Sequence, residues 1–404
     1  METVNLNIRH LLCALKIMEC GALSQAAQEI HLTQSALTQG INKLESQLQC
    51  CLFERSHAGM QVTDIGHAFL HRVKRAFAHL EDFSGILFAH DKLQRSAFIR
   101  AVSSRQLRAL IHIVQLQSYT AAAQFLGLSQ PTLHKTIKDL EQLCQQSLLS
   151  RSPTGVEPGW RAKQLRRYGS LFFAELQQGI DEIREVNGQM NGSLRVGSLP
   201  LARTEIVPLA VLKLNDEFPD ASISIIDGPY GEQYHSLLHG QLDMIVGALR
   251  PLHTQQDTQQ IHLFDDQLSI VVRADHPLAS RQTISAAELQ QLEWVAPAKS
   301  TPARNVFSQI FSRRGLTPPS HVIECSSLVA VRGILLNSQR AALLPARQVE
   351  VEVRAGLLAV CPMALTGTDR VIGLTLRKSW RPTKMQSRFL EILQQTKEAT
   401  NQFI

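Results

Sequence analysis

The sequence predicts a multidomain protein with two all-α winged-helix modules, each followed by a long linker helix, and then a two-lobed α/β domain. The first observation is a helix-turn-helix pattern that occurs twice: the pattern from Leu23 to Glu45 recurs 96 residues later, from Tyr119 to Glu141. The second is a long amphipathic stripe after each copy. The third is a change, after about residue 190, to short apolar runs between amphipathic segments, which is typical of an α/β sheet.

Length and composition agree with several domains. At 404 residues the chain exceeds what one hydrophobic core usually supports. No apolar run reaches the roughly 18 residues that a membrane span requires, and the N-terminus lacks the basic-then-apolar pattern of a secretory signal. The seven cysteines show no Cys-x-x-Cys spacing, which argues against a zinc finger or a disulfide framework. We therefore expect a cytoplasmic protein that makes no membrane contact.

Residues 1–65 are expected to form the first winged helix. An apolar repeat at helical spacing ends at Gly21, and glycine commonly ends helices. Ser24 is expected to cap the second helix and Thr33 the third, because a hydroxyl can accept from the free amides at a helix start. The short, glycine-interrupted stretch 52–63 is typical of a two-stranded wing.

Residues 66–103 are expected to hold the first linker helix, because an apolar stripe without a proline runs from Gly66 to about Leu93. The second winged helix, 104–160, repeats the plan, and its linker helix lies within 161–190. Such a stripe needs a partner surface. Two partners remain open: the linker helix of another subunit, or the winged helix of the same module.

Residues 191–404 are expected to form the two-lobed α/β domain. Four apolar runs predict strands of the first lobe and three predict strands of the second, in a parallel sheet. These runs are 194–196, 223–226, 244–247 and 268–272, followed by 294–296, 322–324 and 341–344. A last helix is expected from Thr383 to about Gln395. Two such lobes would leave a cleft between them.

Several segments together carry a family resemblance. They are Ser24-Gln25-Ala26-Ala27, Thr33-Gln34-Ser35-Ala36-Leu37, Ile41, Leu44-Glu45 and Leu52-Phe53-Glu54-Arg55, then Leu194-Arg195-Val196-Gly197, Gly240-Gln241-Leu242-Asp243 and Asp275-His276-Pro277-Leu278. In this combination the chain resembles the LysR-type transcriptional regulators over almost its whole length. The resemblance implies a bacterial cytoplasmic regulator in which a linker helix joins a winged helix to an effector domain similar to periplasmic binding proteins. It also implies a homodimer or homotetramer.

The chain departs from that family in two respects. An ordinary member has one winged helix, whereas this sequence has two. In addition, Pro158-Gly159-Trp160 stands in the second copy where the first has Val62-Thr63-Asp64, the usual junction between wing and helix. We therefore expect the second wing to differ from the first.

The third helix of each copy is expected to enter the major groove of double-stranded DNA and to present its N-terminal side chains to base edges. The candidate DNA-binding residues are Ser24, Thr33, Gln34, Ser35, Thr38, Gln39, Asn42, Lys43 and Arg55 in the first copy, and Thr120, Ser129, Gln130, Pro131, Thr132, His134, Lys135, Lys138 and Arg151 in the second. Amides such as Gln39 and Asn42 can pair with adenine. Ser24, Thr33, Thr120 and Ser129 are expected mainly to cap helices.

Charge makes the two copies unequal. Residues 104–168 hold nine basic and three acidic side chains, which accounts for the whole net charge of +6, whereas residues 8–72 hold five of each. Basic side chains attract phosphate without reading sequence. Our hypothesis is that the first copy supplies more base readout and the second more backbone affinity. Two alternatives stay open: the second copy's basic cluster is only a solvated face, or the second copy binds protein, such as another subunit or RNA polymerase.

A small-molecule effector is expected between the lobes, because ligands of α/β sheets sit at the carboxyl ends of strands, where helix N-termini offer amides to anions. The candidates are Ser198, Leu199, Pro200, Arg203 and Arg250 in lobe one, and Lys299, Ser300 and Thr301 in lobe two. The three basic residues favour a small carboxylate or an oxygen-rich sugar derivative. The alternative is that these residues only cap helices or carry surface charge.

We expect no cofactor, metal site or catalytic centre. His67 and His71 have the spacing of helical metal ligands, but no third ligand accompanies them. Phosphate-loop, dinucleotide and nucleophile-elbow motifs are missing. The competing class is a small-molecule-binding or catalytic α/β protein whose N-terminal modules serve assembly, and it predicts no salt-sensitive binding to DNA. In a regulator, closure of the lobes on an effector is expected to change the spacing of the winged helices.

Overall fold

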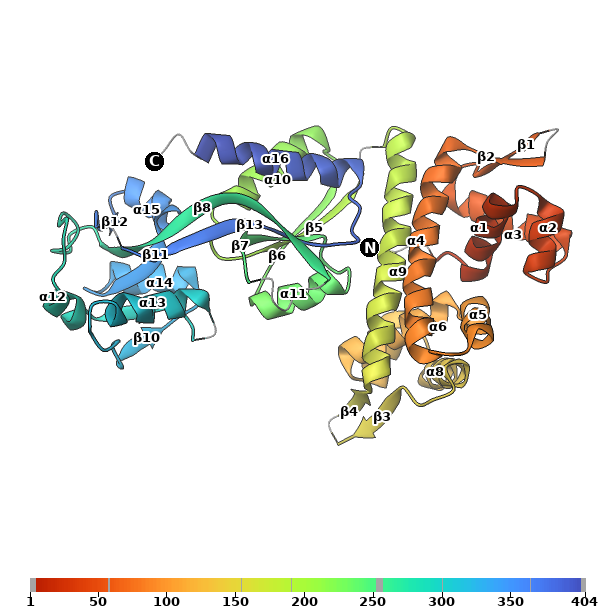
Figure 1. Cartoon of the computed structure of the whole chain (residues 1–404), viewed down its shortest axis with the longest axis horizontal. Coiled ribbons are helices and arrows are strands. Elements are labelled where there is room, and N and C mark those ends of the chain that lie inside the picture. Colours follow the sequence, from red (N-terminus) through yellow and green to blue (C-terminus); the bar gives the residue numbers. More distant parts are fainter. Residues whose placement is uncertain are drawn as a thin grey trace.

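The computed structural model describes residues 5–56, 59–153, 155–189, 191–251, 257–299, 301–363 and 365–400. Figure 1 shows two winged helices beside a pair of long helices, and an α/β domain of two lobes on the other side of that pair. This architecture confirms the predicted fold class. Among the helices of the described segments, none combines the length and hydropathy that crossing a membrane requires.

The first winged helix consists of three helices and a two-stranded wing. Its elements are α1 (Ile8–Cys20), α2 (Leu23–Glu29), α3 (Gln34–Leu48), β1 (Phe53–Ser56) and β2 (Gly59–Val62). Gly21 ends α1 in the left-handed region at φ +68°, as predicted. Thr33 caps α3 by accepting from the amide of Ala36 at 3.2 Å. Ser24 does not cap α2, because the helix already begins at Leu23 and Ala22 holds the N-cap position.

The second winged helix repeats the first, and each of its elements begins 96 residues after its counterpart. Its elements are α6 (Ser104–Leu116), α7 (Tyr119–Leu126), α8 (Gln130–Cys144), β3 (Leu149–Ser152) and β4 (Gly155–Pro158). Ser129 caps α8 through the amide of Thr132 at 3.3 Å. The cap of α7 is Ser118, not Thr120, which lies inside the helix. The N-cap position is therefore the one occupied by Ala22 in the first copy.

The two wings have the same strand register, so the expected difference between them is wrong. Phe53 pairs with Val62 in the first wing, and Leu149 pairs with Pro158 in the second. The junction keeps its backbone hydrogen bond as well: the amide of Gly159 donates to the carbonyl of Leu148 at 3.0 Å. The altered residues change the start of the next helix instead. Thr63 caps the first linker helix with its hydroxyl, whereas glycine at 159 has no side chain to do so.

The linker helices are α4 (Asp64–Leu87) and α9 (Trp160–Val186). The first was expected to reach about Leu93, but it ends six residues earlier. Asp91 caps a separate helix, α5 (Lys92–Ala101), and Arg95 donates to the carbonyl of Phe88 at 2.8 Å, which closes the turn between the two helices.

The partner of α4 is α9 of the same chain. The two helices pack along their length and run antiparallel, because Phe77 meets Phe172 with ring centroids 5.8 Å apart and Phe83 meets Tyr168 at 6.4 Å. Both winged helices and both linker helices share one hydrophobic core. The main partner of α4 is therefore neither the linker helix of another subunit nor its own winged helix, the two partners that the sequence left open.

The described residues of the α/β domain form nine strands in one mixed sheet. Lobe one has β5 (Ser193–Ser198), β6 (Ser222–Asp227), β7 (Met244–Ala248) and β13 (Asp369–Arg377); lobe two has β9 (Trp294–Ala296), β10 (Val322–Glu324), β11 (Ala341–Pro345) and β12 (Leu358–Val360). The long β8 (Thr258–Arg273) pairs with β13 in lobe one and with β11 in lobe two. The seven predicted strands are present, but the run 268–272, which was predicted for lobe one, pairs with β11 in lobe two. The sheet is also not all parallel: β8 leaves lobe one and β13 returns to it, so these two strands run antiparallel.

Helices cover the sheet of each lobe and complete its core. Lobe one has α10 (Ile206–Glu217), α11 (Tyr230–Leu238) and α16 (Lys384–Thr400), and lobe two has α12 (Ala286–Gln291), α13 (Pro302–Ser312), α14 (Leu328–Leu336) and α15 (Glu350–Arg354). The helix α16, which contains the predicted last helix, packs on α10 through Met385 and Phe389. Lobe two has its own cores, built around Trp294 and Val271.

Candidate functional site

The recognition helix α3 buries one side and exposes its amides on the other. Leu37, Ile41 and Leu44 lie in the core. The exposed candidates on or beside the helix are Ser24, Thr33, Gln34, Ser35, Gln39, Asn42 and Lys43. The remaining candidate, Thr38, is half-buried and donates its hydroxyl hydrogen to the carbonyl of Gln34 at 2.9 Å. Among these exposed side chains, the amides of Gln39 and Asn42 have the donor and acceptor groups that pairing with adenine requires.

The recognition helix α8 has the same buried side but a more constrained outer side. Gln130 donates to the hydroxyl of Thr120 at 2.6 Å, and His134 stacks on Tyr119 with ring centroids 3.9 Å apart. Thr132 shares a hydrogen bond with the capping hydroxyl of Ser129 at 2.7 Å. Several candidate base readers of this copy are thus engaged within their own helix-turn-helix.

The remaining candidates on the second copy are exposed. They are Pro131, Lys135 and Lys138 on α8, and Arg151 on the wing strand β3. Lysine and arginine at such positions suit phosphate contact. The side chain of the first-copy wing candidate, Arg55, lies outside what the structure describes.

Part of the second copy's basic excess holds the protein together. Arg167 forms an ion pair with Asp257 of lobe one at 2.7 Å, and Arg108 lies over the ring of Phe173 at 4.7 Å. Burial lowers the pKa of Arg166, which is half-buried. The basic cluster at the start of α9 is therefore split between structural contacts and the exposed residues Arg161 and Lys163.

A repeated acidic residue anchors each wing to its recognition helix, a role that the sequence analysis missed. Glu45 accepts from the amides of Leu52 and Phe53 at 2.7 and 3.1 Å. Glu141 accepts from the amides of Leu148 and Leu149 at 2.7 and 3.2 Å. Because the glutamate belongs to the repeated pattern, its recurrence was the signal that could have revealed this role.

The lobe-one candidates gather at the carboxyl ends of β5, β6 and β7. Arg203 pairs with Asp227 at 3.1 Å and donates to the carbonyl of Ser198 at 3.2 Å. Arg250 lies over the ring of Tyr230 at 4.8 Å, and burial lowers its pKa. The two predicted arginines thus already have structural contacts.

Two buried polar atoms in this cluster have hydrogen-bonding capacity that no described residue uses. Ser198 and Gln233 are 0% and 2% exposed, and the hydroxyl of Ser198 and the Oε1 of Gln233 have no hydrogen-bond partner among the described residues. Such groups are costly to bury unless a water or a ligand satisfies them. Gln233 was not among the predicted site residues, although its place in the first turn of the helix after β6 made it detectable.

Two other lobe-one candidates differ from each other. Leu199 is a core residue: it is 5% exposed, and its amide donates to the carbonyl of Val246 at 2.9 Å. A Cβ at Gly247 would lie 2.4 Å from that of Leu199, so this backbone packs closely. Pro200 is exposed. Leu199 therefore supports the site from the core side.

The lobe-two candidates lie at the ends of β9 and β10. Lys299 is exposed, and its amide donates to Glu324 at 3.3 Å. Thr301 caps α13 by accepting from the amide of Arg304 at 3.3 Å, and Arg304 lies 3.9 Å from Glu324. Ser300 lies outside the described residues. The described contacts hold each cluster together within its own lobe.

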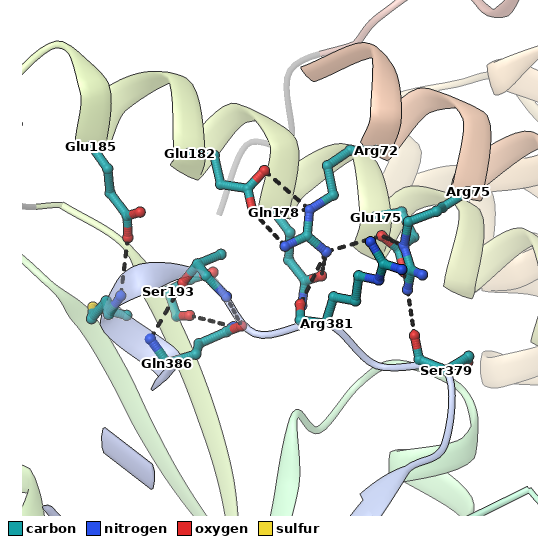
Figure 2. Close-up of polar contacts among 12 residues, drawn as sticks. Arg72, Arg75, Glu175, Gln178, Glu182, Glu185, Ser193, Ser379, Arg381 and Gln386 are labelled. Carbon is teal, nitrogen blue, oxygen red and sulfur yellow. Dashed lines mark hydrogen bonds and ion pairs between the residues drawn. The ribbon is translucent and has the colours of Figure 1, made fainter. Parts of the chain in front are cut away.

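A polar junction, none of whose residues was predicted from the sequence, joins both linker helices to lobe one (Figure 2). Arg72 of α4 is 4% exposed and contacts Glu175, Gln178 and Glu182 of α9. Its Nη1 also donates to the carbonyl of Arg381 in lobe one at 3.0 Å. Four partners from two other segments therefore surround one buried guanidinium.

A second arginine completes the junction. Arg75 binds Glu175 through two hydrogen bonds, at 2.7 and 3.0 Å, and also donates to the carbonyl of Ser379. Burial alone would raise the pKa of Glu175, but the hydrogen bonds and charges of Arg75 and Arg72 outweigh burial and hold that pKa below its usual value. The carboxylate is therefore charged and fully paired.

Further contacts join the end of α9 to β5 and α16, and Figure 2 shows those of Glu185 and Gln386. Asp181 accepts from the hydroxyl of Ser193 at 2.8 Å, and Glu185 accepts from the amide of Met385 at 3.3 Å. Gln386 donates to the carbonyl of Ser193 at 3.1 Å. The helix pair and lobe one are thus held together as one block.

Three segments of the chain match families of known proteins. Residues 187–398 match the family described as "LysR substrate binding domain". Residues 8–67 and 104–160 each match "Bacterial regulatory helix-turn-helix protein, lysR family". Both copies of the repeat are therefore recognised separately as helix-turn-helix segments of one family.

Curated relatives and solved structures agree with these matches. The chain is 29% identical over 371 residues to the HTH-type transcriptional regulator GalR of Pseudomonas putida. The aligned region covers 92% of each protein and so takes in both copies. It is 26% identical over 294 residues to PcaQ of Agrobacterium fabrum, which covers 73% of this chain and 94% of that protein. A full-length OxyR variant from Pseudomonas aeruginosa has a TM-score of 0.55 at 22% identity, over 72% of this chain and 97% of that one. CbnR, a LysR family transcriptional regulator, has a TM-score of 0.52 at 19% identity, over 73% and 99%.

Proposed function

Since the chain belongs to the LysR family of bacterial transcriptional regulators, we propose that its two winged helices share DNA binding unequally, with base reading by the first copy and backbone binding by the second. The family consists of DNA-binding regulators with an effector-binding domain, not of enzymes. Membership therefore favours DNA binding by the N-terminal modules over a role in assembly alone. We further propose that the protein acts in the cytoplasm, where bacterial DNA lies.

The contrast between the two recognition helices carries this proposal. In α3 the amides of Gln39 and Asn42 are exposed, and each good bidentate pair with a base gives roughly 1–3 kcal/mol of discrimination. In α8 the corresponding surface offers Lys135 and Lys138, while its polar neighbour Gln130 is bonded to Thr120. Lysines contact phosphate whatever the base sequence is, so the second copy suits affinity for DNA more than discrimination between sequences.

The salt dependence of DNA binding tests this division of labour. The variant Lys135→Gln/Lys138→Gln/Arg151→Gln is compared with Lys213→Gln/Arg281→Gln/Arg354→Gln, which removes the same charge from exposed sites of the effector domain. We expect the first variant to lower the slope of log K against log salt by about 0.9 for each lost phosphate contact, and the control to leave it unchanged. An unchanged slope in the first variant contradicts the proposal and favours a protein partner for the second copy, such as another subunit or RNA polymerase.

For the effector domain, we propose a small carboxylate or an oxygen-rich sugar derivative bound at the lobe-one cluster. Arg203 and Arg250 supply positive charge there, and the Oγ of Ser198 and the Oε1 of Gln233 lack partners among the described residues. Lys299 and Thr301 are the lobe-two residues assigned to the same ligand. A panel of small carboxylates and sugar acids tests the assignment by thermal shift, since a ligand that binds only the folded state raises its stability. We expect Gln233→Leu to abolish the shift given by the wild type.

We also propose that chains associate through lobe one. The edge strand β6 and the helix α10 expose four large apolar side chains, namely Leu209, Leu212, Ile225 and Ile226. An open edge strand with apolar side chains is a surface on which another chain can pair. Sedimentation of the variant Leu212→Glu/Ile225→Glu tests this: we expect a dimeric or tetrameric wild type and a variant of lower mass.

A further inference from the structure

We infer that one chain is a complete two-site DNA-reading unit, in which α4 and α9 form inside the chain the interface that two subunits of a symmetric dimer would share. This inference rests on the proposed DNA binding by both copies. It adds that the two modules of one chain, not those of two chains, occupy neighbouring segments of one DNA site.

The contacts between α4 and α9 are reciprocal, as they are in a two-fold symmetric interface. A Cβ at Gly179 would lie 3.0 Å from the ring of Phe69, and Gly179 corresponds to Phe83 of the first copy. Phe83 in turn meets Tyr168, which corresponds to Arg72, about one helical turn from Phe69. A Cβ at Gly179 would also lie 3.0 Å from the Cβ of Arg72, so positions 72 and 83 of the repeat meet twice, once from each helix.

In a two-fold symmetric helix pair, a residue at the centre contacts the equivalent residue of the other helix. In the α4–α9 pair, this centre lies near Phe77. Phe77 packs edge-on against Phe172, which corresponds to Ala76, only one residue from Phe77 in the repeat. Both rings are almost fully buried. The internal two-fold axis thus passes near the middle of α4 and α9, and the apolar stripes of both helices are used within the chain.

The buried charges fit pairing of α4 with α9 better than pairing of two copies of α4. Glu175 and Glu182, which hold the guanidinium of Arg72, correspond to His79 and Ile86 in the first copy. An α4–α4 pair between two chains would therefore leave Arg72 without either carboxylate. Removing one side of a buried ion pair is strongly destabilising, because the other charge stays buried and unpaired.

Pairing of two copies of α9 would leave a buried carboxylate without an arginine. Arg72 and Arg75 correspond to Tyr168 and Leu171, so an α9–α9 pair would bury Glu175 without a guanidinium. The two helices have thus become complementary, like the two sides of a heterodimer. The second winged helix connects α4 to α9 in the same chain, so each helix has its complementary partner close by.

The pairing sets the distance between the two DNA-reading modules. Each winged helix precedes its linker helix, so the antiparallel arrangement places the two modules at opposite ends of the pair (Figure 1). With 24 and 27 residues, α4 and α9 are about 36 and 40 Å long at 1.5 Å per residue. One turn of B-DNA rises about 34–36 Å. The length of the pair therefore suits two recognition helices entering successive major-groove segments on one face of the duplex.

The first test counts protected DNA segments per bound chain. The full-length protein is bound to a duplex that it has itself selected from a random pool; native mass spectrometry gives the number of chains, and hydroxyl-radical footprinting gives the number of protected backbone segments. We expect two segments for each chain, whatever the oligomeric state. One segment per chain overturns the inference but leaves DNA binding by the family-typical copy intact, whereas no protection overturns the proposed function as well.

The second test asks whether α4 and α9 pair within one chain, independently of DNA. Arg72→Glu and Glu182→Arg chains are refolded separately and together, and the double variant Arg72→Glu/Glu182→Arg serves as the control. Pairing within a chain predicts that the double variant regains thermal stability and that the mixture of single variants does not. If the mixture regains stability, the helices exchange between chains, because only exchange brings the substituted α4 of one chain against the substituted α9 of another, and the inference fails.

Discussion

Glu45 and Glu141 make the same contact in the two winged helices, and in each case one carboxylate oxygen holds two wing amides. An amide that loses a charged acceptor in a partly buried setting costs about 1–3 kcal/mol. The position is fixed by the fold, not by DNA contact. Glutamate at this point of the repeat therefore identifies a wing that is docked on its recognition helix.

Replacing the second of these glutamates tests the contribution of this contact. We predict that Glu141→Ala lowers the free energy of unfolding by about 1–3 kcal/mol in urea denaturation, because the amides of Leu148 and Leu149 lose their acceptor. Glu157→Ala, which changes an exposed residue of the same wing, is the control and is expected to have little effect. Equal losses in the two variants would contradict the assigned role.

His239 gives the fold a predictable response to acid. It is buried at the end of α11, stacked on His235 at 3.8 Å, and burial, with further repulsion from His235, Arg166 and Arg167, lowers its pKa to about 4. The unfolded chain has the ordinary value of about 6.5. Between these values the unfolded state binds more protons, so stability falls as the pH falls.

The expected effect is a loss of up to about 1.4 kcal/mol per pH unit between pH 6.5 and 4. Urea denaturation at several pH values in this window measures it. We predict that His239→Gln flattens the pH dependence relative to the wild type, because glutamine has no proton to gain. An unchanged profile would show that other groups cause the acid response.

Residue roles were predictable from sequence where one local rule decides them. Thr33 and Ser129 cap their helices as predicted, because a hydroxyl just before a helical repeat has few alternatives. Ser24 and Thr120 were misassigned by two positions, since the helix start depends on how the preceding turn packs and not on the hydroxyl alone. The Oε1 of Gln233, which has no hydrogen-bond partner in the part of the chain that the structure describes, was missed because burial is a property of the fold.

At the level of elements, the repeat predicted both winged helices and the apolar runs predicted seven strands. The partner of α4 was not predictable, because an amphipathic stripe looks the same whichever surface covers it. Its charged residues were even less informative: Arg72 has the sequence appearance of a solvated residue, yet it is buried against partners more than 100 positions away. The strands β12 and β13 were missed, and the antiparallel pairing of β8 with β11, β12 and β13 was not predicted.

The buried junction predicts a large effect from one arginine. We expect Arg72→Met to lower the free energy of unfolding by about 3–5 kcal/mol, because Glu175 and Glu182 lose a shared partner inside the protein. The control is Arg354→Gln, which removes an exposed ion pair with Glu350; such pairs contribute at most about 1 kcal/mol. Guanidinium denaturation compares the two, and a loss for Arg72→Met no greater than that of the control would contradict the junction's role.

For the whole molecule, the junction limits how an effector can act. Lobe one is fixed to both linker helices through the carbonyls of Ser379 and Arg381 and the contacts of Glu185. If an effector closes the lobes, lobe two therefore moves against a block that includes the helix pair. The spacing of the two winged helices within one chain should then change little, and the response should appear in how chains are arranged on the DNA.

The specificity ratio, the affinity for a selected duplex divided by that for random DNA, tests the division of labour between the two copies most directly. We predict that Gln39→Ala/Asn42→Ala lowers this ratio, by a factor of about ten or more for each base pair whose readout is lost, without changing the salt slope. Lys135→Gln/Lys138→Gln/Arg151→Gln should weaken binding to both DNAs alike and leave the ratio unchanged. A second-copy variant that lowers the ratio as much as the first-copy variant would contradict the account.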